Sequence, residues 1–221
     1  QQVAKGGRGQ INIAVDRNGR PQRIRHLIVD FYRHVPDMER HIFPEVFNGV
    51  WGALADGRVD AAIGATQAVP VGGRFAFRDM GSLNWRCVVQ ADHPLLQQTG
   101  PLSDDLLREW PSLTLEDTSR ALPKRNAWTR DNQRRLVVPD WDSALDCLRA
   151  GLCVGMIPGH FAQGWIAEGG IAELTLANPF PISPCCLSWS EQSASPALNW
   201  LLDYVGDSDT LNAEWLSEPS A

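Results

Sequence analysis

The 221-residue chain has no long apolar run. None of its hydrophobic stretches approaches the roughly 20 residues that a membrane-spanning helix needs, which excludes a helical membrane protein. The first ten residues, QQVAKGGRGQ, contain no apolar core of the kind found in a secretion signal. We therefore expect no membrane partner and a cytoplasmic location.

Cysteine is present but not in a pattern that predicts disulfides or a metal site. The five cysteines are an odd number, Cys185 and Cys186 are adjacent, and no C-x-x-C motif occurs. A reducing compartment fits this usage. Cys87, Cys147 and Cys153 have apolar neighbours, which is typical of small core residues.

A surplus of basic residues is also missing. Twenty Lys and Arg residues stand against 26 Asp and Glu, giving a net charge of −6 and a pI of about 5.3. Phosphate contacts supply most of the affinity of nucleic-acid-binding proteins, so we expect this chain not to bind DNA or RNA itself. After Gly206 four acids occur without a base, and residues 207–221 are predicted to form an acidic tail.

The sequence lacks the common catalytic and phosphate-binding motifs. It has no GxSxG, HExxH, GxxxxGK[ST] or helix-opening GxGxxG, and the GGRG at 6–9 precedes the first predicted strand. His26 and His34 are eight residues apart, two helical turns, so they form no metal-binding pair. We expect no catalytic residue, no metal and no cofactor.

What the chain does contain is alternating strand and helix patterns. Residues 10–16 alternate apolar and polar side chains, and 21–34 repeat apolar residues at helical spacing from Pro21 to the stop at Pro36. Further strands and helices follow through residue 65 in the order β-α-β-α-β, which implies a parallel sheet with right-handed crossovers.

A second strand and helix run covers the middle of the chain. The predicted fold class is α/β, with two Rossmann-like lobes and a ligand cleft between them. Lobe I is predicted to hold 10–89 plus 185–206, and lobe II 90–184, with crossings near Val89-Gln90 and near Ser183–Cys185.

Candidate binding residues follow from one rule: open parallel sheets bind ligands outside the carboxyl ends of their strands. We call the residues that it selects, together with a nearby tryptophan, the strand-end set. Its members are Asp16, Arg17, Asn18, Thr66, Thr118, Ser119, Trp141, Asp142, His160 and Phe161. Turn formation or helix capping is the simpler explanation for any single member, but one rule selects the group.

The chemistry of the strand-end set predicts a neutral ligand. Arg17 and the neighbouring Arg120 are the cations in these loops, whereas a phosphorylated or dianionic ligand needs a cationic cluster. Trp141, between two aspartates at a predicted helix start, can stack on a flat ligand; a rim position or packing between lobes is the alternative.

Five segments carry a family resemblance. They are INIAVD, FYRHVPDME, LADGRVDAAIGAT, CVVQADHPL and WDSALDCLRAGLCVGMIP. Together they resemble the effector-binding domain of LysR-type transcriptional regulators over about residues 10–206. Within that family, EVFNGVW, GGRFAFRDMG, EDTSRALPKR and NPFPISPCCLSW are similar to a branch that responds to purine nucleosides.

The resemblance implies a fold, partners and a role. The fold would be that of a type 2 periplasmic-binding protein, and the effector would be a small molecule, with a purine nucleoside or related purine compound favoured. The resemblance also implies a homodimer or homotetramer in which the helix at 21–34 packs on a partner's second lobe. DNA would be contacted only through a winged helix-turn-helix absent from this sequence, and RNA polymerase would be a further partner.

Two other functions fit the residues without the resemblance. A solute-binding protein for transport shares the two-lobed plan, and a small enzyme can use the same cleft. The absence of a signal peptide disfavours the first, and the absence of a nucleophile–base pair disfavours the second.

Overall fold

The structure is a computed structural model that describes residues 10–35, 39–45, 48–66, 74–116 and 130–218. The chain forms two compact units, each with a five-stranded sheet of its own. Unit 1 contains the described residues up to Ser82 and those from Pro184 to Leu216. Unit 2 contains Leu83–Glu116, the described residues up to Ser183, and Ser217 and Glu218. The expectation of two separate sheets is met.

Unit 1 begins with the predicted β-α-β-α-β run. Its elements are β1 (Gln10–Asp16), α1 (Pro21–His34), β2 (Glu39–Glu45), α2 (Asn48–Ala55), β3 (Ala61–Thr66), β4 (Phe75–Leu83), β10 (Ser183–Ser190), α6 (Pro196–Val205) and α7 (Ser208–Leu211). The strand order is β2-β1-β3-β10-β4. β1 pairs in parallel with both β2 and β3, so these three strands end at one edge, whereas β10 is antiparallel to β3.

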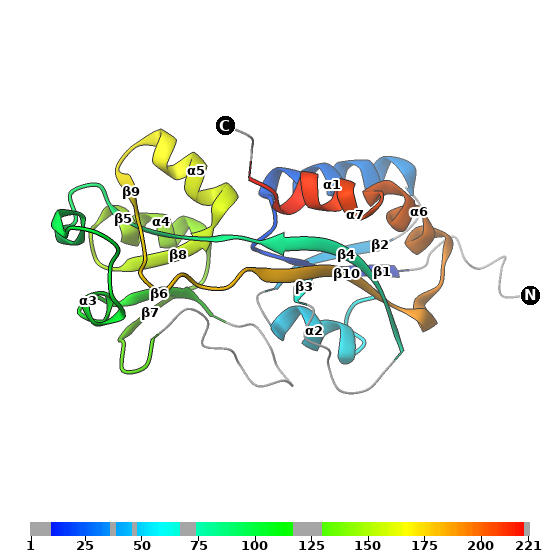
Figure 1. The fold of residues 1–221 in the computed structure, drawn as a ribbon. Coiled ribbons are helices and arrows are strands. Elements are labelled where there is room, and N and C mark those ends of the chain that lie inside the picture. The colour runs from blue at the N-terminus through cyan, green and yellow to red at the C-terminus, as the bar shows by residue number, and fades with distance from the viewer. Residues whose placement is uncertain (1–9, 36–38, 46–47, 67–73, 117–129, 219–221) are drawn as a thin grey trace, which may run out of the picture. The chain divides into compact units, whose positions relative to one another are not determined.

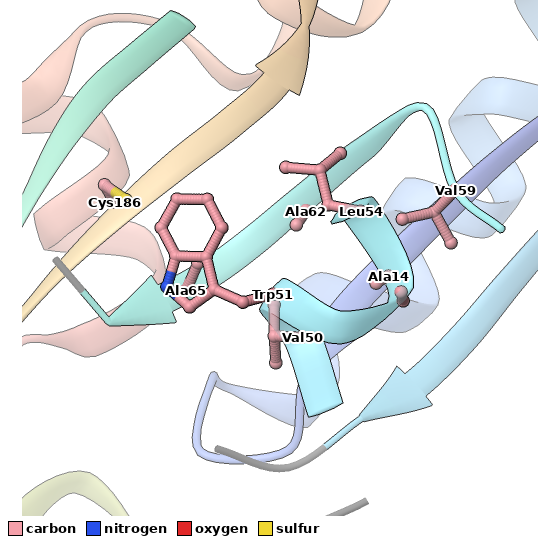
Figure 2. Packing of buried hydrophobic residues seen from close by; sticks show 9 residues of the cluster. Ala14, Val50, Trp51, Leu54, Val59, Ala62, Ala65 and Cys186 are labelled. Carbon is pink, nitrogen blue, oxygen red and sulfur yellow. The ribbon is translucent and has the colours of Figure 1, made fainter. Parts of the chain in front are cut away.

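Helices cover both faces of the unit 1 sheet, with α1, α6 and α7 on one side and α2 on the other (Figure 1). On the α2 side, Trp51 and Leu54 pack against the small residues Ala14, Ala62 and Ala65 (Figure 2). Small strand side chains are what let the indole lie close to the sheet. On the other side, Leu27 and Phe31 of α1 are buried, and alternation along β1 turns Ile13 and Val15 away from α2.

Unit 2 repeats the strand and helix alternation. Its elements are β5 (Trp85–Gln90), α3 (Asp104–Arg108), β6 (Ser112–Leu115), β7 (Arg135–Val138), α4 (Trp141–Arg149), β8 (Val154–Pro158), α5 (Gly159–Glu168) and β9 (Ile171–Leu174). The strand order is β7-β6-β8-β5-β9. β6 pairs in parallel with β7 and β8, which brings the carboxyl ends of these three strands to one edge.

Both faces of the unit 2 sheet are also covered. One face packs Cys87, Val89 and Met156 against Leu95, Leu102 and Leu107. α4 and α5 both contact β5. Gly155 in β8 has no side chain at the point where Leu148 of α4 approaches, which allows α4 to lie close to the sheet.

The predicted lobe boundary at residue 89 is wrong by about seven residues. β5 pairs with β8 and β9, so it belongs to unit 2, and the first crossing comes after Ser82. Only Asn84 separates β4 from β5, so no turn or loop segment marks the change of sheet. The second crossing, between Ser183 and Pro184, lies where it was predicted.

The prediction of an acidic tail beginning at residue 207 also needs correction. Residues 207–216 form α7 and a wide helical turn (Asn212–Leu216) that belong to unit 1. Leu211, Trp215 and Leu216 are buried, and Asn212 Nδ2 donates to the Met80 carbonyl at 2.9 Å. The acidic side chains face outward while the apolar ones complete the core, so net charge alone misdescribed this segment. We call Asp207–Glu218 the C-terminal segment.

Candidate functional site

In unit 1 the strand-end set is centred on the loop between β1 and α1. Asp16 ends β1 and is only 3% exposed. Its Oδ1 accepts a hydrogen bond from the Asn18 backbone N–H at 2.7 Å, which closes a tight Asx turn, and the Gly19 N–H donates to the Asp16 carbonyl at 3.1 Å. The Asp16 carboxylate therefore fixes the conformation of the β1–α1 loop as well as supplying negative charge.

Asn18 offers a buried side-chain acceptor at this loop. Its side chain is 7% exposed, and its Oδ1 has no hydrogen-bond partner among the residues that the structure describes. A buried acceptor without a donor costs stability unless something else supplies the hydrogen bond. A ligand N–H or O–H group would satisfy this oxygen.

Gly64 on the neighbouring strand makes room for Asp16. A Cβ at position 64 would lie 2.8 Å from Asp16 Cβ, and the φ of Gly64 is +89°, which side-chain-bearing residues rarely adopt. Only glycine meets both conditions. The small-residue strand thus positions the carboxylate at the end of the next strand.

The other members in the first half of the chain are less fully described. Thr66 is the last residue of β3, which lies beside β1 in parallel register and ends at the same edge. Arg17 is half-buried in the loop after β1. Thr118, Ser119 and Arg120 lie outside the described residues, so their placement stays a prediction.

In unit 2 the site residues stand at the starts of two helices. Asp140 is the N-cap of α4, because its Oδ1 accepts from the Ser143 backbone N–H at 2.7 Å. Trp141 is therefore the first residue of the helix, and Asp142 is exposed in its first turn. α5 begins directly after β8 and places His160 and Phe161 in its own first turn.

Trp141, His160 and Phe161 form an aromatic cluster. The ring centroids of Trp141 and Phe161 are 5.5 Å apart, those of His160 and Phe161 are 4.8 Å apart, and Trp165 lies 6.2 Å from Trp141. Trp141, His160 and Phe161 are half-buried. The structure thus brings together three members of the set and gives Trp141 packing partners within unit 2.

Sequence reasoning missed the contribution of the C-terminal segment to this loop. A Cβ added to Gly19 would meet the Trp215 ring at 3.4 Å, and the Arg20 backbone N–H donates to the Trp215 carbonyl at 3.0 Å. Arg20 Nη1 also donates to the Ala213 and Glu214 carbonyls. The available signal was the apolar spacing of Leu211, Trp215 and Leu216 within an acidic stretch.

The described residues show no group prepared for nucleophilic or metal chemistry. Burial raises the pKa of the Cys87, Cys153 and Cys186 thiols to about 12, so these thiols stay protonated. Within the described ranges, no three His, Cys, Asp or Glu side chains are grouped to hold a metal ion. In the same part of the chain, no helix has the length and apolar character to cross a bilayer.

Comparison with known proteins identifies the class. The model of the family described as "LysR substrate binding domain" matches residues 4–209. The chain therefore belongs to this family, and it is the effector-binding domain of a LysR-type transcriptional regulator. The resemblance drawn from the sequence motifs is confirmed.

The chain is similar to individual regulators of this family. The chain is 63% identical over 219 residues to the HTH-type transcriptional regulator PunR of Escherichia coli K12, covering 99% of this chain and 71% of PunR. It is 32% identical over 199 residues to the HTH-type transcriptional activator AllS of Salmonella paratyphi A, covering 90% of this chain and 65% of AllS.

Solved structures confirm the fold. The regulatory domain of MetR from N. meningitidis superimposes with a TM-score of 0.67 at 15% identity, covering 96% of this chain and 99% of that domain. The regulatory domain of Synechocystis CcmR, in complex with 2-PG, gives a TM-score of 0.67 at 15% identity, covering 93% and 96%. The expected two-lobed, type 2 periplasmic-binding-protein-like class is thereby confirmed.

Proposed function

We propose that this domain senses a neutral purine nucleoside or a closely related purine compound, and that binding controls transcription through DNA-binding heads elsewhere in the full protein. The similarity to PunR and to the purine-nucleoside-responsive branch supports this effector class. The domain would carry out no reaction, act in the cytoplasm, and work as a homodimer or homotetramer whose regulator also meets RNA polymerase. Effector would stabilise one of two conformations over the other.

The observation that carries the proposal is the buried Asn18 Oδ1, which finds no hydrogen-bond donor within the described part of the chain, next to the buried Asp16 carboxylate. Both groups accept hydrogen bonds, so the β1–α1 loop is suited to a ligand that donates them. Ribose hydroxyls and exocyclic amines are donors of this kind. A phosphate or carboxylate oxygen would meet repulsion at the same place.

The aromatic cluster supports a flat ligand. Trp141 and Phe161 are half-buried, so part of each ring remains accessible to a purine. Arg17 is the one cation among the described members of the strand-end set. A site that balances the charge of a dianion needs more than one cationic side chain.

Binding by a panel of compounds tests the effector class. Guanosine, inosine and adenosine should raise the melting temperature, whereas inorganic phosphate and dicarboxylates should not; ligand at 100 times its Kd adds about 2.7 kcal/mol of stability. Calorimetric titration of the same compounds checks the result. A wild-type domain that prefers phosphate or a dicarboxylate over every neutral purine compound would contradict the proposal.

Trp141 variants test the stacking role. Trp141→Ala should weaken nucleoside binding about two- to tenfold, because an aromatic pair contributes about 0.5–1.5 kcal/mol beyond its buried area. Trp141→Phe keeps an aromatic face and should retain most of the affinity. Circular dichroism must show both variants folded, and normal nucleoside binding by Trp141→Ala would refute the role.

A further inference from the structure

The C-terminal segment begins on a predicted site loop of unit 1. Trp215 packs beneath Gly19, and three hydrogen bonds from Arg20 to tail carbonyls hold the segment on the β1–α1 loop of unit 1. Arg23 Nη2 lies 3.0 Å from Glu214 Oε2 and adds an ion pair. The chain then passes into unit 2 between Leu216 and Ser217.

In unit 2 the segment ends on the helix that carries His160 and Phe161. The Glu218 carboxylate fills the place that a Cβ at Gly159 would take, directly at the start of α5. Glu218 Oε2 lies 4.0 Å from Arg86 Nη1, and the same guanidinium donates to Glu173 through Nε at 2.9 Å and through Nη2. The carboxylate is therefore held between a helix start and an arginine.

α5 lacks the groups that usually complete a helix start. Its N-cap residue is Pro158, which makes no side-chain cap, and its first turn contains no acidic residue. The Gly159 N–H donates to the Asn84 carbonyl at 2.9 Å. The start of any α-helix carries a partial positive charge from its first N–H groups. Glu218 brings from elsewhere in the chain the negative charge that such a terminus favours.

We propose that the end of the C-terminal segment is an autoinhibitory strap on the first turn of α5, with Glu218 as its removable anchor. While Glu218 lies on Gly159, the first turn of α5 is covered by the chain's own carboxylate, and an effector that uses this turn must displace it. The inference depends on the proposed function only in that the effector uses α5.

The first arm of the test needs no effector. Hydrogen exchange of the α5 first-turn amides is measured in wild type, Glu218→Gln and Glu218→Ala, with Glu168→Gln as control. Glu168 lies at the opposite end of the same helix, so the control makes the same change of charge. Exchange should rise about two- to fivefold in both Glu218 variants, the factor expected for a charge at a helix terminus, and stay at the wild-type rate in the control. Unchanged exchange in Glu218→Ala would overturn the strap.

The second arm measures the affinity of the same four proteins for guanosine and inosine by calorimetry. Both Glu218 variants should bind about two- to fivefold more tightly than wild type, because the effector no longer competes with the anchor. Faster exchange without tighter binding would overturn autoinhibition. If none of the proteins binds a nucleoside, the proposed effector class fails, and the exchange result alone supports or overturns the strap.

Discussion

His93 is a buried side chain whose protonation can make the stability of unit 2 depend on pH. It is 1% exposed, its Nδ1 accepts from the Leu95 backbone N–H at 3.1 Å, and its ring centroid lies 4.2 Å from that of Trp110. With Nδ1 as acceptor, the proton of the neutral ring is on Nε2, which is buried and has no hydrogen-bond partner in the described ranges. Protonation would place a charge in this apolar setting, and desolvation accordingly lowers the pKa of His93.

This arrangement predicts an acid-sensitive unit. The pKa of a histidine in the unfolded chain is about 6.5 and that of folded His93 is lower, so the unfolded state takes up the proton first as pH falls. The contribution of His93 to stability is complete above about pH 6.5 and declines below it. His93→Asn keeps an acceptor for the Leu95 N–H but cannot titrate. Urea unfolding at pH 7.5 and 5.5 should show a smaller loss of stability for this variant than for wild type. An equal loss in both would exclude His93 as the cause.

Gly64 is a second residue on which the candidate site depends, because it leaves room for Asp16. Gly64→Ala should destabilise unit 1 by about 1–3 kcal/mol, because it combines an unfavourable φ with a collision against Asp16 Cβ. Gly57→Ala is the matched control, since Gly57 has a φ of +71° and no atom within 4 Å of the added Cβ. Chemical denaturation should rank Gly64→Ala as the more damaging, with nucleoside binding reduced only there. Equal losses of stability in the two variants would mean that Asp16 can move away from a Cβ at position 64 without cost.

At the scale of helices and strands, local chemistry made most of the fold predictable. Ser195 accepts from the Leu198 N–H at 3.1 Å at the start of α6, and Pro196 follows in the first turn, as the Ser-Pro pair indicates. Ser103 caps α3 in the same way. Such signals lie within four residues of sequence, so they can be read without knowledge of the tertiary structure.

Asp140 tests whether such a cap also positions the candidate site. Asp140→Ala should cost about 1 kcal/mol of stability and loosen Trp141, which follows it directly. Asp146→Ala, an exposed position later in the same helix, should change stability by less than about 0.5 kcal/mol. Thermal unfolding and the near-ultraviolet signal of the tryptophans check both variants. Equal stabilities would show that the cap adds nothing.

Features that depend on distant pairing were not predictable in this way. The sheet to which β5 belongs is decided by β8 and β9, which come more than 60 residues later. The rule that parallel strands end at one edge selected Trp141, His160 and Phe161, whose rings do meet in unit 2. Effector binding by the strand-end set stays a prediction. The contact of Glu218 with Gly159 had no local signal, since nothing near either residue specifies the other.

At the scale of the whole molecule, α1 carries the surface that we expect to assemble. Phe31 packs inward, edge-on to Trp200 at 4.9 Å, whereas Tyr32 is 64% exposed and Ile28 and Val29 are nearly half exposed. Three neighbouring exposed apolar side chains on one helix face are typical of an interaction surface. A two-fold dimer would use this face on both copies.

Sedimentation tests this assembly. Wild type at tens of micromolar should sediment above its monomer mass of 24.4 kDa, whereas Ile28→Glu with Tyr32→Glu should sediment as a monomer. Phe77→Glu is the control, because Phe77 on β4 of unit 1 is 49% exposed and also apolar. A wild-type monomer, or loss of assembly in the control alone, would rule out α1 as the interface.

The burial of the thiols has a practical consequence for labelling. At pH 7.5 a thiol with a pKa near 12 is deprotonated in fewer than about one molecule in ten thousand, so Cys87, Cys153 and Cys186 should react with maleimides only when the protein opens. Cys185 is also buried, which leaves Cys147, half-buried on α4, as the accessible thiol. The natural sequence therefore offers one attachment point for a fluorophore. That point lies six residues beyond Trp141 on the same helix, where a dye can report on nucleoside binding without any engineered cysteine.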